Sequence, residues 1–199
     1  MIGKKTARSL LSGVAALAAV TMVTALPATA NDFEPQIRSF YAESVKPWLS
    51  DPAVVEAVKA QNAETGGLSD ADIEALDQKW RGEKEAGSGP TIDKVLGNDL
   101  SNFLKGKKDA AGGIITEVFV MDAKGLNVGQ SDVTSDYMQG DEAKWQKTYG
   151  AGPDAVFVDD VEFDDSSESF QSQVSGTVVD PATGEAIGAI TVGVAVENL

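Results

Sequence analysis

The period of the hydrophobic residues changes at residues 110–113, and this change restricts the fold more than any other feature of the sequence. Before it, apolar residues recur at spacings of three and four, as on one face of a helix. After it, the segment 114–121 (IITEVFVM) is apolar on both alternating faces, which is typical of a central strand covered on both sides. We therefore expect an α+β protein with a helical part at 31–112 and a β-rich part at 113–199, folded together as one domain.

Proline, glycine and capping residues divide the helical part. An apolar stripe over 33–48 predicts a long N-terminal helix that Pro47 ends or kinks. The pair at 51–52, Asp then Pro, fits the cap and first position of a second helix. Ser69 opens a third helix with a variant of the capping box. Thr91 is expected to cap a further helix.

The β-rich part contains five strand candidates joined mostly by short turns. They lie at 114–121, 126–131, 155–163, 169–179 and 186–196. Gly125 suits the left-handed position of the first turn, and DPATGE at 180–185 is a typical hairpin turn. The expected architecture is PAS-like: an antiparallel sheet of five to six strands with the long N-terminal helix packed on one face.

The first 30 residues have the pattern of a cleaved secretory signal peptide. Three basic residues precede a charge-free apolar run at 10–26, and Ala28 and Ala30 supply the small residues of a cleavage site. We expect cleavage before Asn31 rather than retention as an anchor, because the run is marginal in length for a membrane span. The mature chain is therefore expected to be soluble and either periplasmic or secreted.

The composition argues against several functions. The chain has no cysteine and no histidine, so it forms no disulfide and lacks the usual zinc ligands and nucleophile–base pairs. We predict that it is not an enzyme and that it carries no cofactor. The 31 acidic residues outnumber the 16 basic ones, which argues against nucleic acid as a partner. The acidic segment 159–169 lacks the spacing of an EF-hand loop, so no metal site is expected.

The segment 135–149 (SDYMQGDEAKWQKTY) places three aromatic residues, an acidic pair and glutamines between two strand candidates. On a helix over 137–149, Asp141, Trp145 and Tyr149 lie one turn apart. Aromatic side chains with a few polar groups are the usual lining of a small-molecule pocket. The alternative is that the aromatic residues pack this helix onto the sheet while the acidic residues face water.

The strand pattern places polar residues on one face of the sheet. Gln171, Gln173, Ser175 and Thr177 alternate with apolar residues, and Asp159 alternates with apolar neighbours in its own strand. A ligand could lie on this face beneath the segment 135–149; alternatively, the face is solvated. The candidate ligand-binding residues are Tyr137, Gln139, Asp141, Glu142, Trp145, Tyr149, Asp159 and Gln173.

Taken in order, these segments resemble the Cache, or PAS-like, extracytoplasmic sensor domains. The resemblance rests on VFVMDAKGLNVGQS, SDYMQGDEAKWQ and DPATGEAIGAITVGVAV, together with the long N-terminal helix. The set is similar to a stand-alone single-Cache subgroup that is exported without a signalling domain of its own. This resemblance implies a small-molecule-binding sensor whose pocket lies between the sheet and residues 135–149.

Departures from the family pattern restrict the class of ligand that the resemblance implies. Amino-acid-binding members have an Arg in the helix after the first hairpin and an Asp in the final strand. This chain has no Arg in 135–149, and Gly193 stands near the Asp position. The lysines of this segment, Lys144 and Lys147, would be weaker partners for an α-carboxylate than an Arg. Asp141 or Glu142 beside Trp145 suits a cationic or amine-bearing ligand better.

The sequence stops at Leu199, directly after the last strand candidate, where the resembling receptors continue into a membrane helix. We therefore expect either a separate membrane receptor or kinase as signalling partner, or a protein that only binds a solute. The alternative function is a non-enzymatic interaction or structural protein of the cell envelope. That alternative predicts a large exposed apolar patch and no enclosed pocket.

Overall fold

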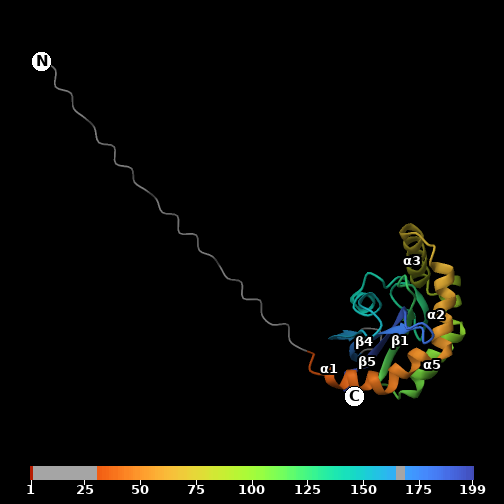
Figure 1. Ribbon diagram of the computed structural model, residues 1–199, viewed down its shortest axis with the longest axis vertical. Helices are drawn as coiled ribbons and strands as arrows, with labels where there is room; N and C mark the ends of the chain where they lie inside the picture. Colours follow the sequence, from red (N-terminus) through yellow and green to blue (C-terminus); the bar gives the residue numbers. More distant parts are fainter. Residues whose placement is uncertain (2–30, 165–168) are drawn as a thin grey trace.

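The computed structural model describes Met1, residues 31–164 and residues 169–199. The predicted signal peptide, apart from Met1, and part of the acidic segment 159–169 therefore lie outside the described residues. Within them, an antiparallel sheet carries the N-terminal helices on one face (Figure 1), which confirms the predicted α+β fold class. No helix of the described part is long and apolar enough to cross a membrane.

In the described part of the chain, five strands pair in the order β2-β1-β5-β4-β3, and every neighbouring pair is antiparallel. Their bounds are β1 (Ile115–Met121), β2 (Asn127–Gln130), β3 (Val156–Asp164), β4 (Ser169–Val179) and β5 (Ala186–Ala195). Each agrees with its sequence candidate to within one or two residues. Gly125 has φ +80° in the turn between β1 and β2, as its predicted left-handed position requires.

The helical segments are α1 (Glu34–Phe40), η1 (Tyr41–Val45), η2 (Lys46–Ser50), α2 (Pro52–Thr65), α3 (Asp70–Glu85), α4 (Pro90–Leu96), α5 (Asp99–Ala110), α6 (Ala143–Gln146), η3 (Tyr149–Ala151) and η4 (Val196–Asn198). The first three form one continuous helical stretch that ends at Asp51. It widens to a π turn before Pro47, where the Lys46 N–H bonds the Tyr41 carbonyl, and then tightens to a 3-10 turn. Pro47 lacks the N–H that an α-helical bond needs, which accounts for the predicted irregularity.

The predicted start of the helix near residue 91 is wrong, and the stretch divides into α4 and α5. Pro90 occupies the first turn of α4, and the Glu83 carboxylate of α3 accepts the N–H groups of Thr91 and Ile92 at 2.8 and 2.9 Å. Thr91 therefore lies inside the helix, because another helix supplies its cap. Asn98 then caps α5 by accepting the Ser101 N–H at 2.7 Å.

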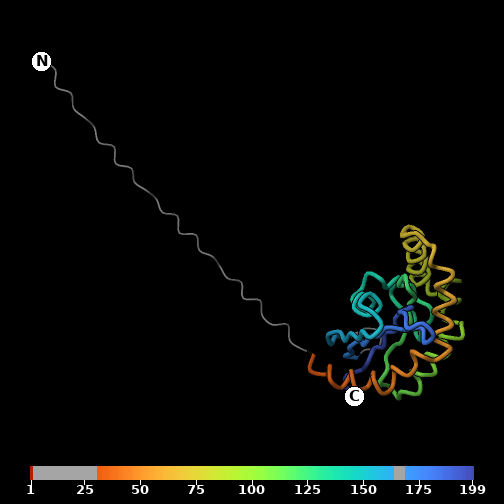
Figure 2. The backbone as a smooth tube through the Cα atoms, viewed as in Figure 1, coloured from red at the N-terminus to blue at the C-terminus, as the bar shows by residue number. Residues whose placement is uncertain are grey.

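The two faces of the sheet carry different cores. The face toward α1, α2 and α5 is aliphatic; its buried strand residues are Ile115, Val118, Val120, Val128, Val174, Val178, Ile190, Val192 and Val194. The opposite face has a smaller apolar cluster around Phe119, Met121 and Ala189. Figure 2 shows residues 131–155 on this second side, away from α2 and α5. The strand alternation therefore separates the main core from the face on which the candidate site lies.

Candidate functional site

The segment between β2 and β3 is mostly irregular, so the helix expected over 137–149 is wrong for most of its length. Only Ala143–Gln146 form an α-helix. Before them the chain runs extended along the β1–β2 turn: Met138 pairs with Leu126, and the Gln139 N–H donates to the Gly125 carbonyl at 2.8 Å. These bonds to β2 and its turn compete with helix formation, which is why the helix begins only at residue 143.

Helix α3 holds this segment in place. The Asp77 carboxylate accepts the N–H groups of Tyr137 and Met138, both at 2.9 Å. The Trp80 indole N–H donates to the Thr134 carbonyl at 3.1 Å, and its ring stacks on Tyr137 with centroids 5.4 Å apart. Residues 134–138 are therefore attached to α3 as well as to the sheet.

A cavity of about 470 Å³ lies between this segment and the second face of the sheet. Its lining residues are Lys84, Glu117, Phe119, Val133, Thr134, Ser135, Gln139, Lys144, Glu162, Phe163, Gln171 and Gln173. A smaller cavity of about 190 Å³ shares several of these residues and adds Glu142, Asp159 and Asp160. We call the two together the sheet cavity. Its volume suits a small molecule rather than a protein segment.

Polar side chains of β1 and β4 form the floor of the sheet cavity. The Glu117 carboxylate accepts the Gln173 amide at 2.9 Å and the Gln171 amide at 3.5 Å. The Thr116 hydroxyl donates to the Gln171 amide oxygen. Gly193 of β5 lies directly between Glu117 and Gln173 in the register. A Cβ there would come within 2.6 Å of the Gln171 amide oxygen, so the glycine makes room for this cluster.

Glu117 is the one acid that β1 places beside Gly193. In this chain the neighbouring strand provides Glu117, the register partner of Gly193.

Lys144 of α6 forms the opposite wall. Its side chain is 12% exposed, and its ammonium lies 2.9 Å from the Glu142 carboxylate and 3.4 Å from the Gln139 amide oxygen. The same ammonium lies 5.3 Å from the centroid of the Phe119 ring, at cation–π distance. Lys144 is therefore fixed by neighbours on three sides and presents a positioned cation to the cavity.

Four of the eight candidate ligand-binding residues come together at the sheet cavity. Gln139 and Gln173 line the larger part, and Glu142, Asp159 and Gln173 line the smaller part. Among the described residues, no group of three or more acidic side chains has metal-binding geometry, and residues 165–168 of the acidic segment are not among those described.

The other four candidates lie elsewhere. Trp145 and Tyr149 contact one another with centroids 4.9 Å apart and pack against the apolar cluster of the second sheet face. The Trp145 indole N–H donates to the Asp122 carbonyl at 3.1 Å. Tyr137 is buried against α3, and Asp141 is exposed in a separate groove that Trp145 also lines. Tyr137, Trp145 and Tyr149 therefore pack the segment, whereas Asp141 faces water.

Glu117, Phe119 and Gln171 also line the sheet cavity and are not among the candidates that the sequence predicts. Glu117 is the only charged residue in β1, and an acid within a mostly apolar strand is a signal that points to a functional face. Gln171 was placed correctly on the polar face by alternation with Gln173. The cavity brings these residues together because β1 and β4 both flank β5.

No protein-family model and no curated protein matches this chain. Solved structures similar to it include the sensor domain of the V. cholerae histidine kinase DctB, at 11% identity and a TM-score of 0.46, covering 83% of this chain and 51% of that one. The sensory domain of the Campylobacter jejuni chemoreceptor Tlp3 (CcmL) is similar at 13% identity and a TM-score of 0.41, covering 81% and 64%.

A third similar structure is the ligand-binding domain of the Pseudomonas fluorescens chemoreceptor CtaA in complex with L-alanine, at 9% identity and a TM-score of 0.38, covering 83% and 60%. The chain thus spans between half and two thirds of the length of these structures. At TM-scores below 0.5 they decide nothing about its ligand, which depends on the cavity itself. They are sensor and ligand-binding domains, the class of domain that the sequence of this chain resembles.

Proposed function

We propose that this protein is an extracytoplasmic sensor domain that binds a small, amine-bearing solute in the sheet cavity. The observation that carries the proposal is the cavity itself, about 470 Å³ in its larger part, with polar side chains converging from the sheet and from residues 133–144. A concave site with an aromatic wall and a few positioned polar groups is the usual form of a small-molecule site. Phe119 supplies that aromatic wall.

The charges around the sheet cavity favour a cationic group on the ligand. Among the described residues, five carboxylates and two ammonium groups line it: Glu117, Glu142, Asp159, Asp160 and Glu162, against Lys84 and Lys144. Lys144 is already paired with Glu142 at 2.9 Å. The excess of negative charge in a concave, partly desolvated space attracts a cation more strongly than the same charges in open water would.

The two walls suggest how such a ligand would be oriented. Glu117, held by two glutamine amides, would receive the ammonium group on the sheet side. Lys144, held over Phe119, would donate to an oxygen of the ligand on the opposite side. The expected ligand is therefore a compact molecule with an amine at one end and a hydroxyl or carbonyl oxygen at the other.

A ligand panel tests this proposal on the purified protein. Diamines, amino alcohols, amino acids, short carboxylates and neutral analogues are compared by thermal shift, and positive results are measured by calorimetry. A ligand that binds only the folded state stabilises it by about 2.7 kcal/mol at a hundred times its Kd. For a domain of this size, that raises Tm by roughly 5–11 °C.

A pair of matched variants locates the ligand. Glu117→Gln keeps the shape and removes the charge, and it should weaken amine binding by roughly tenfold or more. Asp141→Asn removes one charge of the same sign from the separate groove beside Trp145 and should leave the affinity unchanged. Greater loss in Asp141→Asn would move the ligand to that groove, and binding of carboxylates alone would contradict the proposed charge.

A panel without any binding would contradict the sensor proposal and favour the envelope interaction protein. The partner that would receive the signal, a membrane receptor or kinase, stays a prediction from the sequence, as do the periplasmic or secreted location and the absence of enzymatic activity. Co-purification of the wild-type protein with membrane proteins, with and without the ligand that the panel identifies, tests the partner separately.

A further inference from the structure

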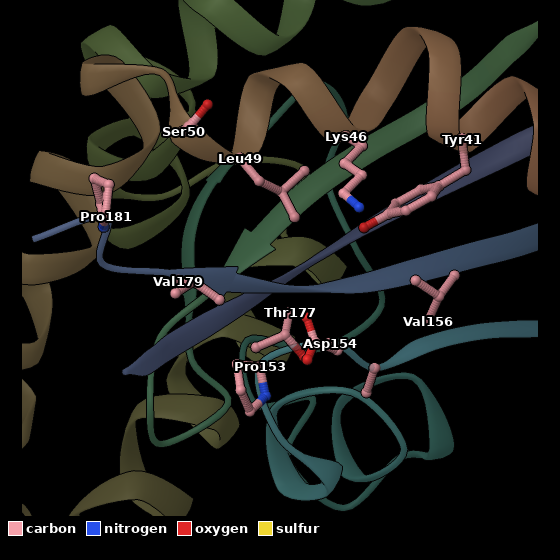
Figure 3. A pocket seen from close by; sticks show the side chains of 11 residues that line it. Tyr41, Lys46, Leu49, Ser50, Pro153, Asp154, Val156, Thr177, Val179 and Pro181 are labelled. Atoms are coloured by element: carbon pink, nitrogen blue, oxygen red, sulfur yellow. The ribbon is translucent and has the colours of Figure 1, made fainter. Parts of the chain in front are cut away.

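A second cavity, of about 370 Å³, lies at the other end of β4, between the N-terminal helical stretch and the loop before β3 (Figure 3). We call it the helix-side cavity. Its lining residues are Tyr41, Lys46, Leu49, Ser50, Pro153, Asp154, Ala155, Val156, Thr177, Val179 and Pro181. None of these residues lines the sheet cavity, so the two spaces are separate.

The helix-side cavity exists because β4 extends beyond the first residue of β3. Val156, the first residue of β3, pairs with Gly176, so β4 continues beyond the start of its neighbour. The preceding loop is turned toward β4 by Thr177, whose hydroxyl donates to the Gly152 carbonyl at 2.7 Å. The N–H of Thr177 donates to the Ala155 carbonyl at 3.3 Å. Between this loop and η2, β3 therefore does not cover the edge of β4, and this part of β4 lines the cavity.

Tyr41 supplies a hydrogen-bond donor to this space. The residue is only 4% exposed, and its hydroxyl makes no hydrogen bond to any described residue. It lies over Gly176, where a Cβ would come within 1.7 Å of the hydroxyl oxygen. Burial raises the pKa of Tyr41 to about 12, so the hydroxyl keeps its proton. The hydroxyl is open to the cavity, where a water molecule or a bound ligand can accept its hydrogen bond.

Lys46 adds a cation on the same wall. It comes five residues after Tyr41, and the π turn between them brings both side chains to the sheet side of the helical stretch, where they point into the cavity (Figure 3). Within the described part of the chain, the Lys46 ammonium is in no ion pair or hydrogen bond. The hydroxyls of Ser50 and Thr177 already donate to backbone carbonyls.

The other end of the cavity is apolar. Leu49 and Val179 face one another across it, with Pro181 beyond them (Figure 3). Asp154 lies exposed on the opposite rim. The arrangement therefore has at one end the enclosed Tyr41 hydroxyl and the exposed Lys46 ammonium, neither with a partner among the described residues. An aliphatic surface lies at the other end, and one exposed acid lies at the mouth.

We propose that the helix-side cavity binds an alkyl carboxylate, with its carboxylate on the Tyr41 hydroxyl and the Lys46 ammonium and its alkyl chain on Leu49 and Val179. A carboxylate accepts both donors at once, and a charge-assisted bond to an ammonium is among the stronger hydrogen bonds. An alcohol could satisfy Tyr41 but would leave the cation without a counter-charge. An alkylamine would be repelled by Lys46.

Hexanoate is a suitable probe, with hexanol and hexylammonium as its neutral and cationic counterparts. Calorimetry on the wild-type protein should show binding of hexanoate in preference to both. Tyr41→Phe and Lys46→Met should each weaken it by roughly fivefold or more. Asp154→Asn should strengthen it, because an acid near the carboxylate is removed. Lys94→Met, which removes an exposed cation from α4, is the matched control and should change nothing.

Amide chemical shifts give a second readout that does not depend on the variants. Hexanoate should shift the amides of Gly176 and Thr177 and leave that of Gly193 under the sheet cavity unchanged. The Glu117→Gln variant should bind hexanoate like the wild type, so this proposal and the proposed function fail independently. Equal binding of hexanol, unchanged affinity in Lys46→Met, or shifts confined to Gly193 would each overturn the proposal.

Discussion

Replacing Asp77 by alanine should detach the segment over the sheet cavity from α3. One carboxylate oxygen accepts the N–H groups of Tyr137 and Met138 at 2.9 Å, and the other lies 2.7 Å from the Arg81 guanidinium. Asp77 is 8% exposed. No other side chain of the described residues accepts these two backbone N–H groups.

The expected loss of stability follows from the two hydrogen bonds. A buried donor left without an acceptor costs about 1–3 kcal/mol. Tyr137 is buried, so its N–H should bear the larger cost, whereas Met138 is half-buried and water can replace part of its bond. We expect a loss of about 3 kcal/mol in the free energy of unfolding, which lowers Tm by roughly 6–12 °C in a domain of this size.

Urea unfolding followed by tryptophan fluorescence measures this loss, because Trp80 stacks on Tyr137 and reports on the same contact. Glu74→Ala, an exposed change on the same helix, is the control and should cost less than about 0.5 kcal/mol. Asp77→Asn should fall between the two, since an amide oxygen still accepts. A free energy within about 0.5 kcal/mol of the wild type for Asp77→Ala would refute the claim that α3 holds the segment.

Two further predictions concern backbone and ionisation. Gly125→Ala should destabilise by more than about 1 kcal/mol in urea unfolding, because φ is +80° and a Cβ would come within 2.4 Å of Gly140. Gly106→Ala in α5, where nothing lies within 4 Å of a Cβ, should instead stabilise by about 0.5–1 kcal/mol; the opposite order would contradict the geometry. Burial raises the pKa of Tyr41 and of Tyr137 to about 12. Because these pKa values are higher when folded, their contribution to stability is complete below about pH 10 and is lost as pH rises through about 12. Near-ultraviolet absorbance should show normal ionisation of these two tyrosines only in the unfolded chain.

Much of the fold follows from local sequence. The alternation that separates Val174 and Val178 from Gln171 and Gln173 assigns the two faces of β4 before any pairing is known. The capping box at Ser69 and the cap at Asp51 fix two helix starts through hydrogen bonds within three residues. Such elements are predictable because the residues that decide them are neighbours in the chain.

The start of α4 and the path of residues 135–149 were not predictable in the same way. The cap of α4 is Glu83, which belongs to the preceding helix. Residues 137–139 are extended because they bond to Asp77 and to the turn at Gly125. These hydrogen bonds override the helical pattern of residues 137–149, and they form only in the folded chain.

The sequence by itself determined the change from helices to strands near residue 113 and the polar face of the sheet. Only the tertiary structure decided which polar residues form a site. Glu117 and Gln173 are 56 residues apart in the chain, yet the glutamine amide lies 2.9 Å from the carboxylate. They meet because β5, inserted between β1 and β4, carries Gly193 at the crossing and leaves space for both side chains. Periodicity assigns a residue to a face, but strand order and register decide its neighbours.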